Sequence, residues 1–290
     1  MIAVELKRQF RRVRTYLGLG LIALVPIAIT LAFKFGNPGH RRRDQGLIAV
    51  ARSSGLNMAI GSLLTTTGFL LVVVVTLFAA DAVAGEASWG TLRYLLIRPV
   101  RRARLLTAKL VASAALALLT TVVVVVVGLV AGLAAFGWHP ATIISPRALS
   151  TPSTSTSPGV AVPNLPSLPV SSMPPTTALW HLLVAMVFIA WSMAGVFAFT
   201  FLVSTLTTKS FGAIAAGVGL MIVSFIFDGI SVIGAVRDYL PTHYWSAWEN
   251  LFVTGGSLGS MWLGVLSAAA YAAVFLAVAW WHFTRKDILT

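Results

Sequence analysis

Six long apolar runs constrain this chain more than any other feature of its sequence. A helix rises about 1.5 Å per residue, so about 20 apolar residues cross the ~30 Å hydrocarbon core of a membrane. Lipid offers no partner to open backbone groups, and no alternating barrel-strand pattern appears in the sequence, so only helices fit. The sequence therefore predicts an all-α integral membrane protein with six transmembrane helices, at 16–35, 57–80, 109–136, 179–204, 211–236 and 257–281.

The composition agrees with a membrane protein and excludes one large class of partner. Of the 290 residues, 58% are hydrophobic and 10% are charged, against about 25% charged residues in soluble domains. The net charge of +13 lies in patches between apolar runs, whereas a soluble nucleic-acid-binding protein carries its charge on a solvated face. We therefore expect no nucleic-acid partner. Cysteine is absent, which excludes disulfides and thiolate metal sites.

The distribution of Lys and Arg predicts the orientation. Most of them lie in the N-terminal segment, in the loop 81–108 and after residue 284, which would all face one side. Basic residues favour the cytoplasmic side. We therefore expect a multi-pass protein of the cytoplasmic membrane with both termini in the cytoplasm. The three arginines at 41–43, in the first outer loop, run against the rule, and their role is left open.

The outer loop 145–177 differs from the rest of the chain. Eight of its 33 residues are Pro and thirteen are Ser or Thr, so it has little apolar surface to offset its ordering entropy. We interpret it as a flexible extracytoplasmic tether. It separates two halves of three spans each within a single transmembrane domain, 16–290.

The segment 1–15 predicts an amphipathic helix on the inner membrane surface. Its apolar residues recur three or four positions apart and share one helical face: Ile2, Leu6, Phe10 and Val13. Basic residues cover the remaining faces, which suits anionic headgroups and the cytosol. Two interpretations stay open, a simple topology anchor and a lever that transmits force into the first span.

The inner loop 81–108 contains a second predicted helix. Gly90 permits a turn, Thr91 can cap the helix that follows, and Pro99 ends it. One apolar stripe is formed by Leu92, Leu95 and Leu96, with Arg93 on another face. A short helix with an apolar ridge and charged flanks suits a groove on a partner protein. The alternative is a loop that rests on lipid headgroups.

This loop resembles the cytoplasmic loop of ABC-2 type permeases, the six-span membrane subunits of ATP-binding-cassette exporters. The matching positions are Gly85, Glu86, Gly90, Thr91, Leu92, Leu95, Leu96, Pro99, Val100, Arg101, Leu105, Leu106, Lys109 and Leu110. The N-terminal basic helix and the tail residues Arg285, Asp287 and Ile288 are also similar to that family.

The resemblance implies a cytoplasmic coupling helix that contacts a separate nucleotide-binding ATPase subunit. The coupling residues would be Glu86, Gly90, Thr91, Leu92, Arg93, Leu95, Leu96 and Arg98, and those of the interfacial helix Lys7, Arg8, Phe10 and Arg11. The chain has no phosphate-binding Gly-x-x-x-x-Gly-Lys-Ser/Thr loop. ATP and Mg would therefore bind the partner subunit, and we expect no cofactor, catalytic residue or metal site in this chain.

The fifth run ends in an unusual sequence. Asp228 is a lone acidic residue near the end of the run, and it belongs either to a pathway or to a helix break at Gly229. The resemblance favours Phe225, Phe227 and Asp228 as residues that line the transport pathway. The aromatic segment 239–252 that follows predicts a short interfacial or re-entrant helix.

We expect an exporter permease that moves an amphipathic or hydrophobic solute, such as a drug, antibiotic, peptide or lipid, and pairs with a second copy or a similar permease. Two alternatives stay open. An ion-gradient transporter would use Asp228 and His181 as proton sites, and a scaffold or sensor would use the inner loop to bind a signalling protein. Two Gly-x-x-x-Gly pairs, 128/132 and 255/259, predict close helix packing.

Overall fold

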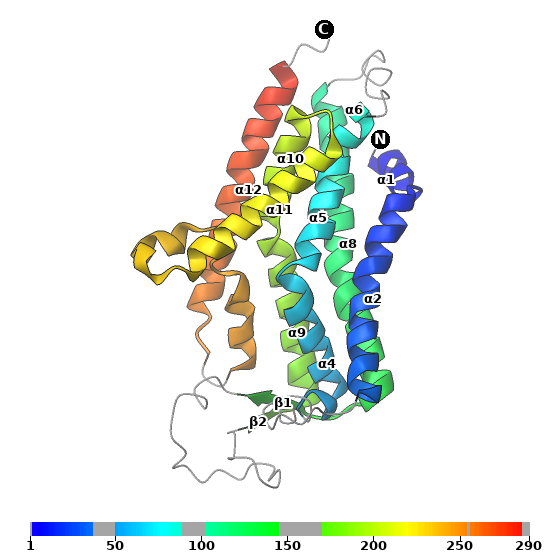
Figure 1. Ribbon diagram of the computed structural model, residues 1–290, viewed down its shortest axis with the longest axis vertical. Helices are drawn as coiled ribbons and strands as arrows, with labels where there is room; N and C mark the ends of the chain where they lie inside the picture. The colour runs from blue at the N-terminus through cyan, green and yellow to red at the C-terminus, as the bar shows by residue number, and fades with distance from the viewer. Residues whose placement is uncertain (1, 37–49, 89–101, 145–169, 254–255, 286–290) are drawn as a thin grey trace.

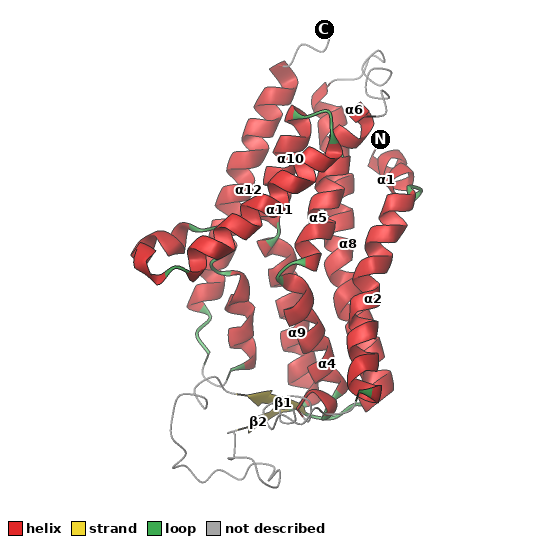
Figure 2. Cartoon of the chain, in the orientation of Figure 1, coloured by secondary structure: helices red, strands yellow, loops and turns green. Residues whose placement is uncertain are grey.

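The computed structural model describes residues 2–36, 50–88, 102–144, 170–253 and 256–285. Most of these residues are helical, and the long helices form a bundle that runs vertically in Figure 1. Figure 2 shows that short loops connect most of the helices. The segments 41–43, 89–101 and 145–169 lie outside the described residues.

The first half of the chain folds into α1 (Ile2–Phe10), α2 (Val13–Phe35), α4 (Gly55–Thr67), α5 (Leu70–Asp81), α6 (Ala84–Ser88) and α8 (Arg102–Phe136). Ser54 caps α4, because its hydroxyl accepts a hydrogen bond from the Leu56 N–H at 3.2 Å. The break between α4 and α5 bends the chain by 57°.

The second half contains β1 (Ala141–Ile144), β2 (Val170–Met173), α9 (Pro175–Ser192), α10 (Ala194–Leu206), α11 (Ser210–Gly229), the 3-10 helices η2 (Ser231–Tyr239) and η3 (Trp245–Phe252), and α12 (Gly259–Arg285). The two strands pair antiparallel, with Ala141 opposite Met173 and Ile144 opposite Val170. Helix α9 begins with Pro175. A backbone N–H at this position would have no acceptor within the helix, so the missing N–H of proline costs little.

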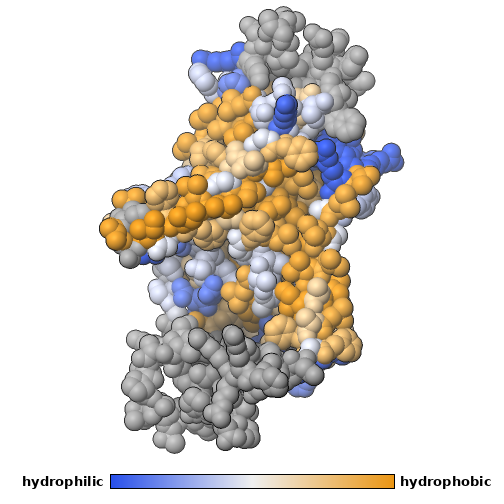
Figure 3. Space-filling model, in the orientation of Figure 1, coloured by the Kyte–Doolittle hydropathy of each residue, from blue (hydrophilic) through white to orange (hydrophobic). Residues whose placement is uncertain are grey.

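Five of the described helices are long and apolar enough to cross a membrane, and a sixth span results if the bent pair α4–α5 counts as one. The five are Val13–Phe35, Ala103–Phe136, Pro175–Leu206, Ser210–Gly229 and Gly259–Arg285. The prediction of an all-α, multi-pass membrane protein is therefore confirmed, and the count of six remains a prediction. In Figure 3, apolar residues cover much of the visible face of the bundle, and hydrophilic ones gather near α1.

Several predicted boundaries were wrong. The predicted N-terminal helix 1–15 ends at Phe10, and Val13, which was expected on its apolar face, begins α2 and is exposed. Helix α8 begins at Arg102 and not at 109, so the end of the loop 81–108 is helical, as is α6 within it. Helix α11 ends at Gly229 because Ile230 is extended, with φ −90° and ψ 103°, and a 3-10 helix follows. The predicted tether 145–177 is too long, since β2 and the first turn of α9 lie within these residues.

The two ends of the bundle differ. At one end, which we call the α1 end, lie α1, α6, the start of α8 and the last turn of α12 (Figure 1). At the other end, which we call the β end, lie β1, β2 and the start of α4. Helix α11 starts at the α1 end and stops partway down, where η2 turns outward and η3 continues toward the β end.

Helix α8 packs closely on α4 through its small residues. A Cβ on Gly128 would lie 3.2 Å from Ser62 Cβ, and a Cβ on Gly132 would overlap the Gly55 carbonyl oxygen. The predicted close packing is thus confirmed for this pair of glycines, whereas Gly255 lies outside the described residues. The buried core between α5, α8, α9 and α10 includes Val75, Leu116, Ile189 and Phe201.

Candidate functional site

A cluster of charged side chains joins α1, α2, α5, α6 and α8 at the α1 end, and Glu86 lies at its centre. The Glu86 side chain is 1% exposed, and α6 presents its carboxylate to three basic groups. Oε1 forms ion pairs with Arg8 and, at 3.3 Å, with Arg12 Nη2, while Oε2 pairs with Lys109. One carboxylate therefore ties α6 to α1, to the α1–α2 junction and to α8.

Lys109 contributes the most deeply buried charge of this cluster. Its side chain is 0% exposed, and its Nζ lies 3.5 Å from Glu5 Oε1 as well as against Glu86. Glu5 in turn accepts a hydrogen bond from Arg8 Nη2 at 2.9 Å. A buried ammonium group is tolerated only when it is paired and hydrogen-bonded. The two carboxylates thus hold α1 against α8.

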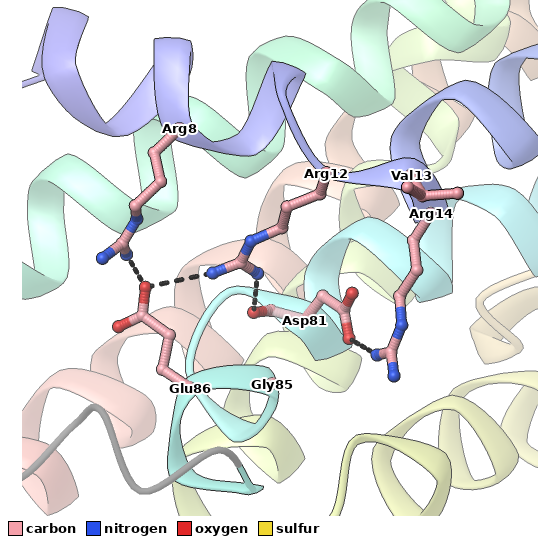
Figure 4. A pocket seen from close by; sticks show the side chains of 7 residues that line it. All are labelled: Arg8, Arg12, Val13, Arg14, Asp81, Gly85 and Glu86. Atoms are coloured by element: carbon pink, nitrogen blue, oxygen red, sulfur yellow. Dashed lines mark hydrogen bonds and ion pairs between the residues drawn. The ribbon is translucent and has the colours of Figure 1, made fainter.

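Asp81, the last residue of α5, forms the second half of the cluster. Its Oδ1 accepts a hydrogen bond from Arg14 Nη1 at 2.8 Å, and its backbone carbonyl accepts one from Arg12 Nη1 at 3.4 Å. Cations are stabilised near a helix C-terminus because the carbonyl groups there carry partial negative charge. Arg12 bridges Glu86 and the end of α5, as Figure 4 shows for these side chains.

A hydroxyl from α10 holds the turn between α5 and α6. Ser204 Oγ accepts hydrogen bonds from the N–H groups of Val83 and Ala84, at 3.3 and 2.9 Å, and donates to the Ala80 carbonyl at 2.8 Å. Ser204 is fully buried. Three backbone groups of the turn are thereby satisfied by one side chain, which fixes the position of Glu86 relative to α10.

Burial and nearby charges shift the pKa values of Glu5 and Arg12, which lie outside the membrane-spanning segments. Burial raises the pKa of Glu5, but the attraction of Lys109 and Arg8 outweighs it, so this pKa lies below the ordinary 4.5. Burial lowers the pKa of Arg12, and the nearby Arg8 adds to that shift. At neutral pH, we therefore expect the Glu5 carboxylate to be ionised. Its ion pair with Lys109 then holds α1 against α8.

A cavity of about 470 Å³ opens among these residues. Its lining consists of Arg8, Arg12, Val13, Arg14, Asp81, Gly85 and Glu86 (Figure 4). Three guanidinium groups and two carboxylates therefore border one space. Among the described residues, no group of His, Cys, Asp and Glu has the arrangement of a metal site.

The residues predicted for the N-terminal helix fall into three environments. Arg8 belongs to the charge cluster, Phe10 is partly buried against the core, and Lys7 and Arg11 are exposed. In the coupling loop, Glu86 is buried in the cluster. The remaining predicted coupling residues lie outside the described part of the chain: Gly90, Thr91, Leu92, Arg93, Leu95, Leu96 and Arg98.

The three predicted pathway residues lie at the end of α11. Phe225 and Phe227 are 37% and 46% exposed, and the Phe225 ring contacts the Trp245 ring edge-on at 5.7 Å. Asp228 Oδ1 lies 2.5 Å from His243 Nδ1 and 3.5 Å from Arg237 Nε. The helix break predicted at Asp228 and Gly229 is confirmed, as is a short helix in the aromatic segment after it.

Sequence reasoning did not find Glu5, Asp81 or Ser204, and it named Lys109 only as a position that matches the resembled family. A usable signal was present for two of them. Asp81 and Lys109 are isolated charges beside long apolar runs, a position that usually marks a paired group. Ser204 gives no such signal, because serine is common in apolar helices and its role depends on the neighbouring turn.

The fold and the site define a multi-pass, all-α membrane protein with a buried charge cluster at one end of its bundle. A family model described as "Protein of unknown function (DUF2705)" matches residues 27–289, and the chain belongs to this family. The match includes Asp81, Glu86 and Lys109 but begins within α2, after the arginines of the cluster. A comparison with curated proteins finds no match.

Proposed function

We propose that this chain is the membrane subunit of an ATP-driven exporter of the ABC-2 type, powered by a separate ATPase subunit. One observation carries the proposal. Glu86, which the resemblance places in the ATPase-coupling loop, is the residue that joins α6 to α1 and α8. A coupling element must be attached to the spans that it moves, and Glu86 provides that attachment.

The position of the Glu86–Lys109 pair supports a role in transmission. Segment 89–101 connects α6 to α8, and the pair joins these two flanking helices. A partner that pushes on 89–101 would therefore displace α6 and α8 together. Arg8 and Arg12 extend the same connection to α1 and the start of α2.

The transported solute in this proposal is amphipathic or hydrophobic. Phe225 and Phe227, the pathway candidates, are partly exposed aromatic residues. An exporter of this type would act as a dimer of permeases with two ATPase subunits. The ion-gradient alternative has less support, because Asp228 is paired with His243 and Arg237 at the end of α11.

The test is to change the apolar ridge of the coupling loop in the full chain. We would express the affinity-tagged Leu92/Leu95/Leu96→Ser variant in the native cells and measure membrane abundance, recovery of ATP-hydrolysing activity and transport of hydrophobic dyes. We expect normal membrane abundance of the variant. The ATPase activity that co-purifies with it should fall more than tenfold, since each buried Leu contributes about 1.5–3 kcal/mol to the interface. Arg101→Gln is the control, because headgroups can satisfy its charge.

Two results would contradict the proposal. One is that no ATP-hydrolysing activity co-purifies with the wild-type chain. The other is full ATPase recovery and transport in the triple-serine variant, which would mean that the loop rests on the membrane only.

A further inference from the structure

Two hollows meet at Arg14. The first is the charged cavity of about 470 Å³ described above. The second, of about 220 Å³, lies between α2, α5 and α11 and is lined by Arg14, Leu17, Leu77, Ser210, Phe211 and Ile214. Arg14 is the residue that lines both, so a guanidinium group stands at the junction of a polar and an apolar space.

The charged cavity has an excess of hydrogen-bond donors. Each guanidinium carries five N–H donors, and a carboxylate offers about four acceptor positions. The three arginines of the cavity therefore have more donors than Asp81 and Glu86 can accept, even when the Asp81 carbonyl is included. Arg8 Nε is buried and has no hydrogen-bond partner among the described residues. The oxygens of an anionic group would satisfy such donors.

The second hollow has the character of an acyl-chain site. Leu17 and Phe211 on its rim are 66% and 77% exposed, and both belong to helices apolar enough to span a membrane. Both of these helices begin at the α1 end, α2 at Val13 and α11 at Ser210. Arg14 therefore lies at the start of a span, near the depth where lipid phosphates meet the hydrocarbon core.

We propose that this junction binds one anionic phospholipid. Its phosphate would lie against Arg14, on the side of the charged cavity, and an acyl chain would pack on Leu17, Leu77, Phe211 and Ile214. The lipid would link α2 to α11, two helices that the charge cluster does not join. The site depends on the chain being a membrane protein and not on the transport function proposed above.

The test compares phospholipids that differ only in headgroup. We would purify the full chain in detergent and measure bound lipid by native mass spectrometry and the thermal unfolding midpoint with added dioleoyl phosphatidylglycerol, dioleoyl phosphatidylcholine or inorganic phosphate. We expect phosphatidylglycerol alone to stay bound and to raise the midpoint. Equal effects of the two lipids would overturn the charge-specific site.

Two variants examine the two halves of the site. Arg14→Gln should weaken phosphatidylglycerol binding by about tenfold or more, whereas Arg104→Gln, at an exposed position on α8, should not. Because Arg14→Gln also breaks the pair with Asp81, Ile214→Trp provides an independent test that leaves the charges intact. It should fill the apolar hollow and displace the lipid, while Ile222→Trp, on the same helix but lining neither hollow, should not.

Free phosphate is the competing source of the same chemistry. If inorganic phosphate stabilises the protein as well as the lipid does, and Ile214→Trp has no effect on that stabilisation, the site binds small anions and the lipid proposal is wrong.

Discussion

At the scale of single residues, Lys109 has the least expected environment. It lies seven residues inside α8, in a run of apolar side chains, and none of its side chain is exposed. Only Glu86 and Glu5 make this position tolerable for an ammonium group. Removing one partner of a buried pair leaves an uncompensated charge, and this costs about 3–5 kcal/mol.

Glu86→Gln should therefore be strongly destabilising, by about 3–5 kcal/mol, because it removes the negative charge from the middle of three cations. The measurement is thermal or denaturant unfolding of the full chain in detergent. Glu249→Gln is the matched control, since Glu249 lies in an exposed position of η3. The double variant Glu86→Gln/Lys109→Met should recover part of the loss, and a single variant as stable as wild type would show that the pair carries no stability.

Glu5 gives the cluster a defined pH dependence. Its pKa is lowered in the folded chain, because the attraction of Lys109 and Arg8 exceeds the effect of burial. The unfolded chain then binds more protons as the pH falls below about 4.5, so stability is lost in that direction. At neutral pH, Glu5→Gln should destabilise the protein by about 1.5–3 kcal/mol. Unfolding measured from pH 7 to pH 3 should show this difference shrinking below pH 4.5, and a constant difference would contradict the assignment.

At the scale of elements, α8 organises the bundle. It contacts α1, α2, α4, α5, α9, α10 and α12, and small residues allow a close approach to α4. A side chain at Gly132 would overlap the Gly55 carbonyl and lie 2.9 Å from Met58 Cβ. Backbone atoms cannot move aside as a flexible side chain can, so the two helices would have to separate.

Gly132→Ala should destabilise the protein by about 1–3 kcal/mol through overpacking. Gly61→Ala, on α4 itself, is the control, because a Cβ there meets nothing within 4 Å. The control should be neutral or stabilising by about 0.5–1 kcal/mol, as alanine favours a helix over glycine. Unfolding midpoints of both variants, measured in the same detergent, test the contrast. Equal midpoints would mean that α4 and α8 are less closely packed than described.

Apolar length and periodicity predicted the helices but not where they end. The spans, the N-terminal helix and the break after Asp228 follow from local sequence. The start of α8 at Arg102 does not, because the arginines at 101, 102 and 104 suggest a loop by charge alone, although charged residues form helices readily. The partners of Glu86 could not be predicted from local sequence either. They come from residues 8, 12 and 109, and only the folded bundle brings those positions together.

At the scale of the whole molecule, both terminal segments lie at the same end. Helix α1 and the last turn of α12 are both at the α1 end in Figure 1, while Ser53 precedes α4 at the β end. This arrangement requires an even number of crossings, which favours α4 and α5 as one bent span. If the orientation predicted from Lys and Arg holds, the α1 end would face the cytoplasm.

Single cysteines would test this orientation without background, because the natural chain has none. Lys7→Cys and Arg285→Cys should react with a membrane-impermeant maleimide only after the cells are opened, and Ser53→Cys should react in intact cells. All three positions are exposed. If the two terminal positions reacted from opposite sides, the number of spans would be odd and the bent pair would not cross the membrane.

The bend between α4 and α5 has a consequence for how the bundle exchanges hydrogen with water. Gly68 and Phe69 form a turn between the two helices, and the ladder of α5 begins with the Val73 N–H bonding the Phe69 carbonyl at 3.1 Å. The first N–H groups of a helix have no partner within that helix. Unbonded amides lack the protection of a helix. In deuterium, peptides that cover 68–70 should take up label earlier than those from either side. Early uptake at 68–70, with slower uptake in the peptides on both sides, would show that water reaches the backbone at the bend, between the two ends of the bundle.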